Sequence, residues 1–173
     1  MDGRVSRLAA RFRKAVLDRD EARKQAEDDA RRAAEEARAA RARLFTDLVV
    51  LAREIGVLRV EPEEGGLTLR FGERYLHFAA EGDGDRVRIE FEGMGDEEHA
   101  LYRQAELGGR WVHHRRRNLS GKLRAAGAPP GLHRDDRVPF FDVGLEDLLV
   151  RGLGMPKPGD DEPEPPGPGS RKL

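Results

Sequence analysis

The stretch from Arg110 to Arg124, RWVHHRRRNLSGKLR, is where basic and aromatic side chains concentrate most strongly in this 173-residue chain. It contains six Arg and Lys residues and no acidic residue. Cationic side chains bind phosphates, and a tryptophan such as Trp111 can stack on a base. Polyanion binding is therefore one candidate function, and its candidate residues are Arg110, Arg115, Arg116, Arg117, Lys122 and Arg124.

The same stretch also has interpretations that need no ligand. Charges on an edge strand discourage aggregation, and Trp111 would then lie in the core. Alternate residues over 110–116 mix apolar and charged types on both faces, so we expect such a strand to lie at a sheet edge or to end early. The basic residues could instead pair with the acidic region 61–106 of the same or a neighbouring subunit.

The five histidines do not form a metal-binding pattern. His113 and His114 are adjacent, so on a strand they point to opposite faces, which is poor geometry for one ion. We expect the run Glu97-Glu98-His99 to be a solvated loop. The chain has no cysteine, which excludes disulfides, thiolate catalysis and cysteine-ligated zinc. We therefore predict no metal site.

Nucleophiles and phosphate loops are also missing from the sequence. The serines are Ser6, Ser120 and Ser170, and none of them lies in a G-x-S-x-G setting. Gly108-Gly109 is not followed by the residues of a phosphate-binding loop. We predict no catalytic residue and no cofactor, so the expected protein is not an enzyme.

The first third of the chain predicts a single long helix that is broken once at most. Residues 4–56 contain no proline and no glycine before Gly56, which lies where a C-cap glycine belongs. A helix of about 50 residues is roughly 75 Å long, which exceeds the width of a small domain. Part of it must project or pair with something.

The apolar pattern of this helix changes along its length. Near its start an apolar patch offers a partner-binding surface made of Val5, Leu8, Phe12 and Val16. The middle has only alanines, which follow the alternating steps of four and three typical of a coiled coil: Ala26, Ala30, Ala33, Ala37, Ala40 and then Leu44. Residues 44–57 are apolar nearly all round, so we expect them to be buried against a sheet.

An antiparallel sheet is indicated by two-residue alternation separated by glycine-rich turns. Its apolar face is predicted to consist of Leu67, Leu69, Phe71, Leu76, Phe78, Val87, Ile89 and Phe91. Residues 97–107 fit a strand or a helix. Residues 118–137 resemble a loop. A helix with Asp142 as its N-cap is expected to carry Leu145, Leu148, Leu149 and Leu153.

These elements predict an α+β fold: a long N-terminal helix, an antiparallel meander of five to six strands, a short C-terminal helix and a disordered tail. We expect a projecting charged, alanine-rich helix over residues 1–43, an α+β domain over 44–155 and a disordered Pro/Gly/acidic tail over 156–173. The tail lacks a large apolar residue before the final leucine, so it cannot offset its ordering entropy.

Our first functional hypothesis is a non-enzymatic interaction or scaffold module that self-associates or docks a protein partner through the N-terminal helix. The second is a nucleic-acid-associated protein that uses the basic 110–124 stretch. The third is an enzyme with an unrecognised site between the sheet and the 118–137 segment. The N-terminus lacks a secretory apolar run and no segment is apolar enough to span a membrane, so we expect no membrane partner and a cytoplasmic location.

Overall fold

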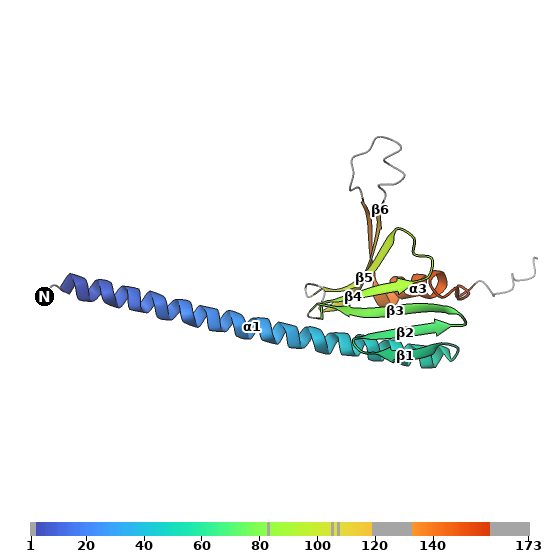
Figure 1. The fold of residues 1–173 in the computed structure, drawn as a ribbon, viewed down its shortest axis with the longest axis horizontal. Coiled ribbons are helices and arrows are strands. Elements are labelled where there is room, and N and C mark those ends of the chain that lie inside the picture. Colours follow the sequence, from blue (N-terminus) through green and yellow to red (C-terminus); the bar gives the residue numbers. More distant parts are fainter. Residues whose placement is uncertain (1–2, 83, 105, 107, 119–132, 160–173) are drawn as a thin grey trace, which may run out of the picture.

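The structure, a computed structural model, describes residues 3–82, 84–104, 106, 108–118 and 133–159. It confirms the α+β class, with a long N-terminal helix, one antiparallel sheet and a short C-terminal helix (Figure 1). Most of the predicted tail, residues 160–173, lies outside the described residues.

Helix α1 (Gly3–Ile55) is continuous over 53 residues, so the single break that we allowed for does not occur. At 1.5 Å per residue its length is about 80 Å. It ends where expected: Gly56 has a φ of 76°, in the left-handed region, and its N–H donates to the carbonyl of Ala52 at 3.1 Å. A glycine is suited to this position because it has no Cβ to clash in that conformation.

We expect Gly56→Ala to lower the free energy of unfolding by about 1 kcal/mol, because alanine is strained at this φ. Gly56→Asn should lose less, since asparagine tolerates the left-handed region better than alanine does. Urea unfolding curves of the two variants and the unchanged chain measure the difference. An alanine variant as stable as the unchanged chain would show that the cap geometry contributes nothing.

The sheet has seven strands in sequential order, each antiparallel to its neighbours. The expectation of five to six strands is therefore slightly low, and residues 97–104 are a strand rather than a helix. The strands are β1 (Arg59–Glu63), β2 (Gly66–Phe71), β3 (Arg74–Glu81), β4 (Arg86–Phe91), β5 (Glu97–Gln104), β6 (Arg110–Asn118) and β7 (His133–Pro139).

Strand β7 corrects two predictions. It occupies the end of the stretch that we interpreted as a loop over 118–137, of which residues 119–132 lie outside the described residues. It also flanks β6, so the basic strand is interior in the sheet order and not at an edge. The physical reason is charge, because the basic residues of β6 lie opposite acidic residues of β7. Arg115 pairs with Asp136 and Arg116 pairs with Asp135.

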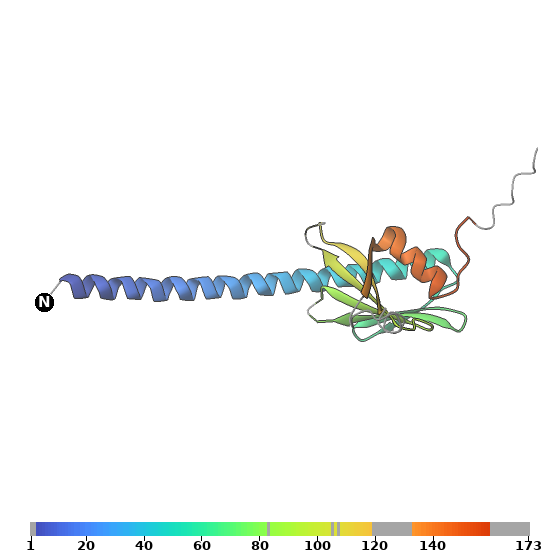
Figure 2. The same cartoon turned by 90° about the horizontal axis from the view of Figure 1, so that it is seen from above.

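The hydrophobic core lies on one side of the sheet, where the end of α1 and the C-terminal helix cover it (Figure 2). Seven of the eight residues predicted for the apolar sheet face are buried, and Phe71 is half-buried. Leu44, Leu48 and Ala52 of α1 pack on this face, as predicted. The prediction for residues 44–57 is wrong at Val50, which is exposed because the sheet covers only one side of the helix, and at Val57, which is also exposed. Trp111 is also part of the core.

The C-terminal helix begins differently from our expectation. A π-helical turn, η2 (Phe140–Gly144), leads directly into α3 (Leu145–Arg151), and Asp142 lies inside that turn rather than at a cap. The turn starts early because buried Phe140 packs edge-to-face on Phe78, with ring centroids 6.3 Å apart. The residue before α3 is Gly144, which makes no side-chain cap.

Candidate functional site

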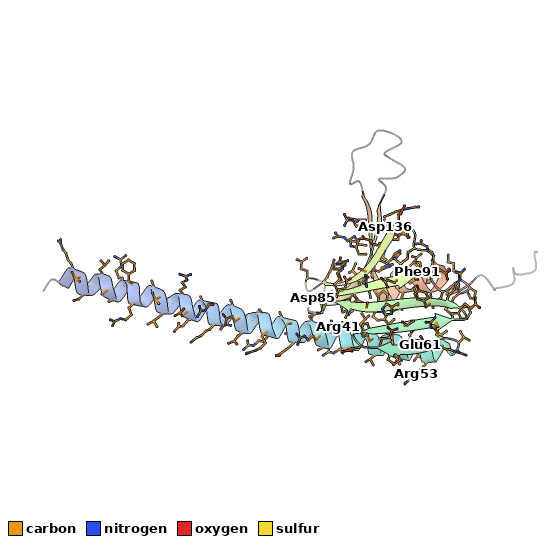
Figure 3. The ribbon with its side chains drawn as sticks, viewed as in Figure 1. Arg41, Arg53, Glu61, Asp85, Phe91 and Asp136 are labelled. Atoms are coloured by element: carbon orange, nitrogen blue, oxygen red, sulfur yellow. The ribbon has the colours of Figure 1, made fainter. Side chains whose placement is uncertain are left out.

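The most unusual surface of the molecule is the part of α1 that extends beyond the sheet domain (Figures 1 and 2). Burial on α1 begins at Ala37, and no side chain of residues 3–36 is buried. Figure 3 shows these side chains projecting on all sides of the helix, and the labelled Arg41 lies close to the start of the sheet domain. We call residues 3–36 the stalk. Its length is about 50 Å.

The stalk exposes the apolar residues that the sequence singled out. Exposed fractions are 69% for Val5, 53% for Leu8, 66% for Phe12 and 59% for Val16. Leu17, which sequence reasoning omitted, is equally exposed at 57%. A cluster of large apolar side chains in water at one end of a helix is typical of an interaction surface rather than of a free monomer.

The alanine seam is shared between the stalk and the sheet domain. Ala37 and Leu44 are buried against the domain, and Ala40 packs at the edge of its core. The approach at Ala37 is close: a Cβ on Gly84, in the turn between β3 and β4, would lie 3.0 Å from the Ala37 carbonyl carbon. The chain's own domain therefore occupies the C-terminal part of the seam. Ala26, Ala30 and Ala33 remain exposed.

Ion pairs within the stalk are weak supports. Arg23 lies 3.6 Å from Asp20 and 3.7 Å from Glu27, and Arg31 lies 2.8 Å from Asp28, all on an exposed surface. Each such pair contributes only a few tenths of a kcal/mol to helix stability. They favour the helical state of the stalk but bury none of its apolar residues.

The candidate polyanion-binding residues do not form one surface. Arg115 and Arg117 share the face of β6 with buried His113, whereas Arg110 and Arg116 are exposed and alternate onto the opposite face. Lys122 and Arg124 lie outside the described residues.

Two of the arginines on β6 have acidic partners within the chain. Arg115 donates to Asp136 at 2.7 Å and lies 3.9 Å from Asp147, and Arg117 lies 3.9 Å from Glu97. Pairing with an acidic residue of the 61–106 region, which the sequence left open, is thus seen at Glu97. The hydrogen bond from Arg115 to Asp136 raises the pKa of Arg115, so this side chain is held as a cation by its own fold.

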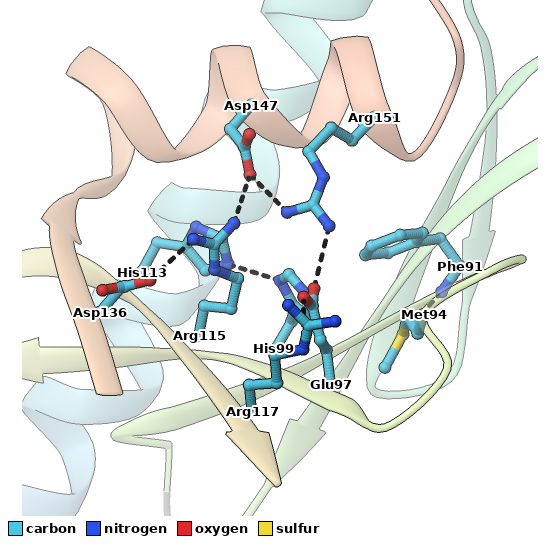
Figure 4. A network of polar contacts seen from close by, with 10 residues as sticks. All are labelled: Phe91, Met94, Glu97, His99, His113, Arg115, Arg117, Asp136, Asp147 and Arg151. Carbon is cyan, nitrogen blue, oxygen red and sulfur yellow. Dashed lines mark hydrogen bonds and ion pairs between the residues drawn. The ribbon is translucent and has the colours of Figure 1, made fainter. Parts of the chain in front are cut away.

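Glu97 is the centre of a polar network between β5, β6 and α3 (Figure 4). Its carboxylate accepts a hydrogen bond from Arg151 at 3.0 Å and one from His99 at 3.1 Å. Arg151 also donates to Asp147 at 3.4 Å, which connects the network to Arg115. The prediction of a solvated loop at Glu97-Glu98-His99 is therefore wrong, because these residues belong to β5 and His99 is buried.

The contacts of the network determine the tautomers of its two histidines. An ionised Glu97 can only accept, so Nε2 of His99 carries the proton and Nδ1 does not. That bare Nδ1 lies 3.0 Å from Nε2 of His113, which must then donate. Nδ1 of His113 is left with a lone pair, and Gly144 packs so closely here that a Cβ on it would lie 3.0 Å from this atom.

Burial lowers the pKa of both histidines. For His113 the pKa falls to about 4, first through desolvation and then through repulsion from His99. For His99 desolvation lowers the pKa and outweighs the hydrogen bond that His99 donates to Glu97, which acts in the opposite direction. Desolvation alone would raise the pKa of Glu97, but hydrogen bonds from Arg151 and His99 lower it overall. Near neutral pH, therefore, Glu97 is charged and both imidazoles are neutral.

These shifts predict an acid-sensitive fold. Between about pH 6.5 and about pH 4 the unfolded chain protonates His113 and the folded chain does not, so the free energy of unfolding must fall as the pH drops through this window. We expect a loss of roughly 2 kcal/mol from this residue. Urea unfolding at several pH values measures it. His113→Asn, which does not titrate, should show a flatter dependence, and an unchanged slope in that variant would contradict the assignment.

Two cavities adjoin strand β6. His113 lines a cavity of about 170 Å³ together with Arg115, Asp136 and Asp147. Another cavity, of about 540 Å³, is lined mainly by apolar residues, with Arg110 and Asp142 as its charged members. Within the described part of the chain, no group of three His, Asp or Glu residues could hold a metal ion.

Comparisons with known proteins add no functional guide, since no protein-family model, curated protein or solved structure matches this chain. Among the described residues, no helix combines the length and apolar character needed to cross a membrane.

Proposed function

We propose that this protein is a non-enzymatic interaction module that associates with itself through the stalk. The observation that supports the proposal is the exposure of five large apolar residues on a helix that extends about 50 Å past its own domain. No side chain of residues 3–36 is buried in the single chain, so the large apolar ones among them are open to a partner.

The energetic argument favours a partner for the stalk. Burying a Val, Leu or Phe side chain completely is worth about 1.5–3 kcal/mol, whereas each ion pair on the stalk is worth a few tenths of a kcal/mol. Val5, Leu8, Phe12 and Val16 share one side of the helix and, with the exposed alanines, offer apolar surface for a helix–helix contact, whereas Leu17 lies about 100° around the helix from Val16. The alanines permit close approach of a second helix, and the large residues supply the area.

The alternatives have weaker support in the geometry. Arg115 and Arg117 already have acidic partners, and the remaining basic residues of β6 lie on its other face. The phosphate backbone of a nucleic acid would therefore contact only some of the predicted polyanion-binding residues. His113 lines a small cavity, but no nucleophile lines it with His113, and no metal ligand set occurs among the described residues.

Sedimentation equilibrium at micromolar concentrations tests the proposal, because the mass that it reports does not depend on the elongated shape of the chain. We expect a mass of at least twice the 19.4 kDa of one chain, and dissociation on dilution. A mass of 19.4 kDa across the whole concentration range would refute self-association.

A further inference from the structure

We infer that two stalks pair antiparallel, with residues 4–16 of one copy lying against residues 17–30 of a second copy. This inference rests on the proposed function and names the partner surface. Three independent features of the stalk support it: its charge, its seam and the position of the sheet domain.

The two segments have opposite charges. Residues 4–16 contain five basic and no acidic side chains, a net charge of +5. Residues 17–30 contain three basic and six acidic side chains, a net charge of −3. Antiparallel pairing brings each positive segment against a negative one, whereas parallel pairing brings the two +5 segments together. Opposite charges across an interface favour the correct orientation and penalise the wrong one.

The seam gives a register for this pairing. The seam follows the alternating three- and four-residue spacing of a heptad repeat. From Leu44 and Ala37 toward the N-terminus, this spacing includes Ala30, Ala26, Arg23, Arg19, Val16, Phe12 and Val5. In a parallel pair Arg19 meets Arg19 and Arg23 meets Arg23 inside the seam, where like charges repel. In an antiparallel pair with Val16 opposite Arg19, Phe12 lies opposite Arg23 and Val5 opposite Ala30.

The flanking positions agree with that register. In an antiparallel coiled coil, equivalent heptad positions on either side of the seam face each other. Arg13 of one copy therefore lies beside Asp20 of the other, and the two-fold symmetry repeats this pair. The arginine stems also cover apolar surface while their charged ends reach water, so Arg19 and Arg23 can border Val16 and Phe12.

The sheet domain obstructs the parallel alternative. Ala37, Leu44 and Leu48 of the same helix face are buried against the chain's own sheet. A parallel partner on this face would bring its own α1 and sheet domain to the same level, where the first domain already lies (Figure 2). In the antiparallel pair the overlap ends near residue 30, about 10 Å before Ala37, and the two domains lie at opposite ends.

The absence of cysteine makes the orientation directly testable, because each introduced cysteine is the only thiol in its chain. In the antiparallel pair the two copies of residue 16 lie near the two-fold axis, and the two copies of residue 5 lie about 37 Å apart. With a short bismaleimide, Val16→Cys should cross-link to itself and Val5→Cys should not. A mixture of Val5→Cys and Ala30→Cys chains should yield the mixed dimer.

A control and the mass of each variant separate the outcomes. Ala10→Cys, on the opposite side of the helix from Phe12, should give no cross-linked dimer. Efficient cross-linking of Val5→Cys to itself, in a protein with dimeric mass, would overturn the antiparallel orientation and leave self-association intact. A dimeric mass with no cross-link at residue 16 would overturn the pairing of these segments, and a monomeric mass would remove both this inference and the proposed function.

Discussion

Phe12→Asp/Val16→Asp is expected to be monomeric at concentrations where the unchanged chain is associated. Both side chains are more than half exposed in the single chain, so the substitutions should leave the fold intact. In the pair they would place carboxylates in a desolvated seam, at a cost of several kcal/mol for each buried charge. We expect the association constant to fall by roughly a thousandfold or more, as measured by sedimentation equilibrium.

Ala10→Asp is the matched control for this variant, because it adds a carboxylate to the same turn on the opposite side of the helix. It should associate like the unchanged chain, and at a dilution where none of them associates all three proteins should unfold at the same urea concentration, because the core begins at Ala37. Persistent association of the double variant would mean that chains meet through some surface other than the stalk.

Glu97→Gln is expected to destabilise the fold by about 3 kcal/mol or more. The side chain of Glu97 is 12% exposed, and its carboxylate accepts hydrogen bonds from Arg151 and His99. Glutamine preserves the shape but removes the charge, which leaves the Arg151 guanidinium without one of its two acidic partners in a partly desolvated site. The free energy of unfolding, from urea titration near neutral pH, measures the loss.

The neighbouring substitution Glu98→Gln controls for the general effect of removing a carboxylate from β5. Glu98 is exposed and points to the other face of the strand, so we expect a change within about 0.5 kcal/mol. Equal stability of the two variants would show that the network around Glu97 contributes no more than a surface ion pair.

Local periodicity predicted the parts of the fold that local chemistry controls. Residues 4–55 lack proline and glycine, so a helix is the default, and Gly56 ends it. The alternation of apolar and charged residues over 67–91 predicted the core face, because a strand that is half-buried repeats every two residues. The exposed apolar residues of the stalk could be named because no other apolar segment is near them in the sequence.

The elements that were missed depend on partners distant in the sequence. Strand β7 consists mostly of charged residues, and its pairing with β6 places Asp136 against Arg115, 21 positions away in the sequence. His99 lies in a run that resembles a loop, and it is buried only because His113 and Glu97 satisfy both of its nitrogens. Burial on α1 begins at Ala37, where Gly84 approaches the helix closely. No pattern in the sequence around either residue indicates this contact.

Hydrogen exchange of the stalk amides as a function of protein concentration tests the central claim most directly. A lone helix of about 34 residues supported by weak ion pairs opens readily, so its amides exchange quickly. If stalks pair, amides of residues 4–30 should become slower to exchange as concentration rises, while those of the sheet stay constant. Rapid exchange across residues 4–30 at every concentration would contradict the account.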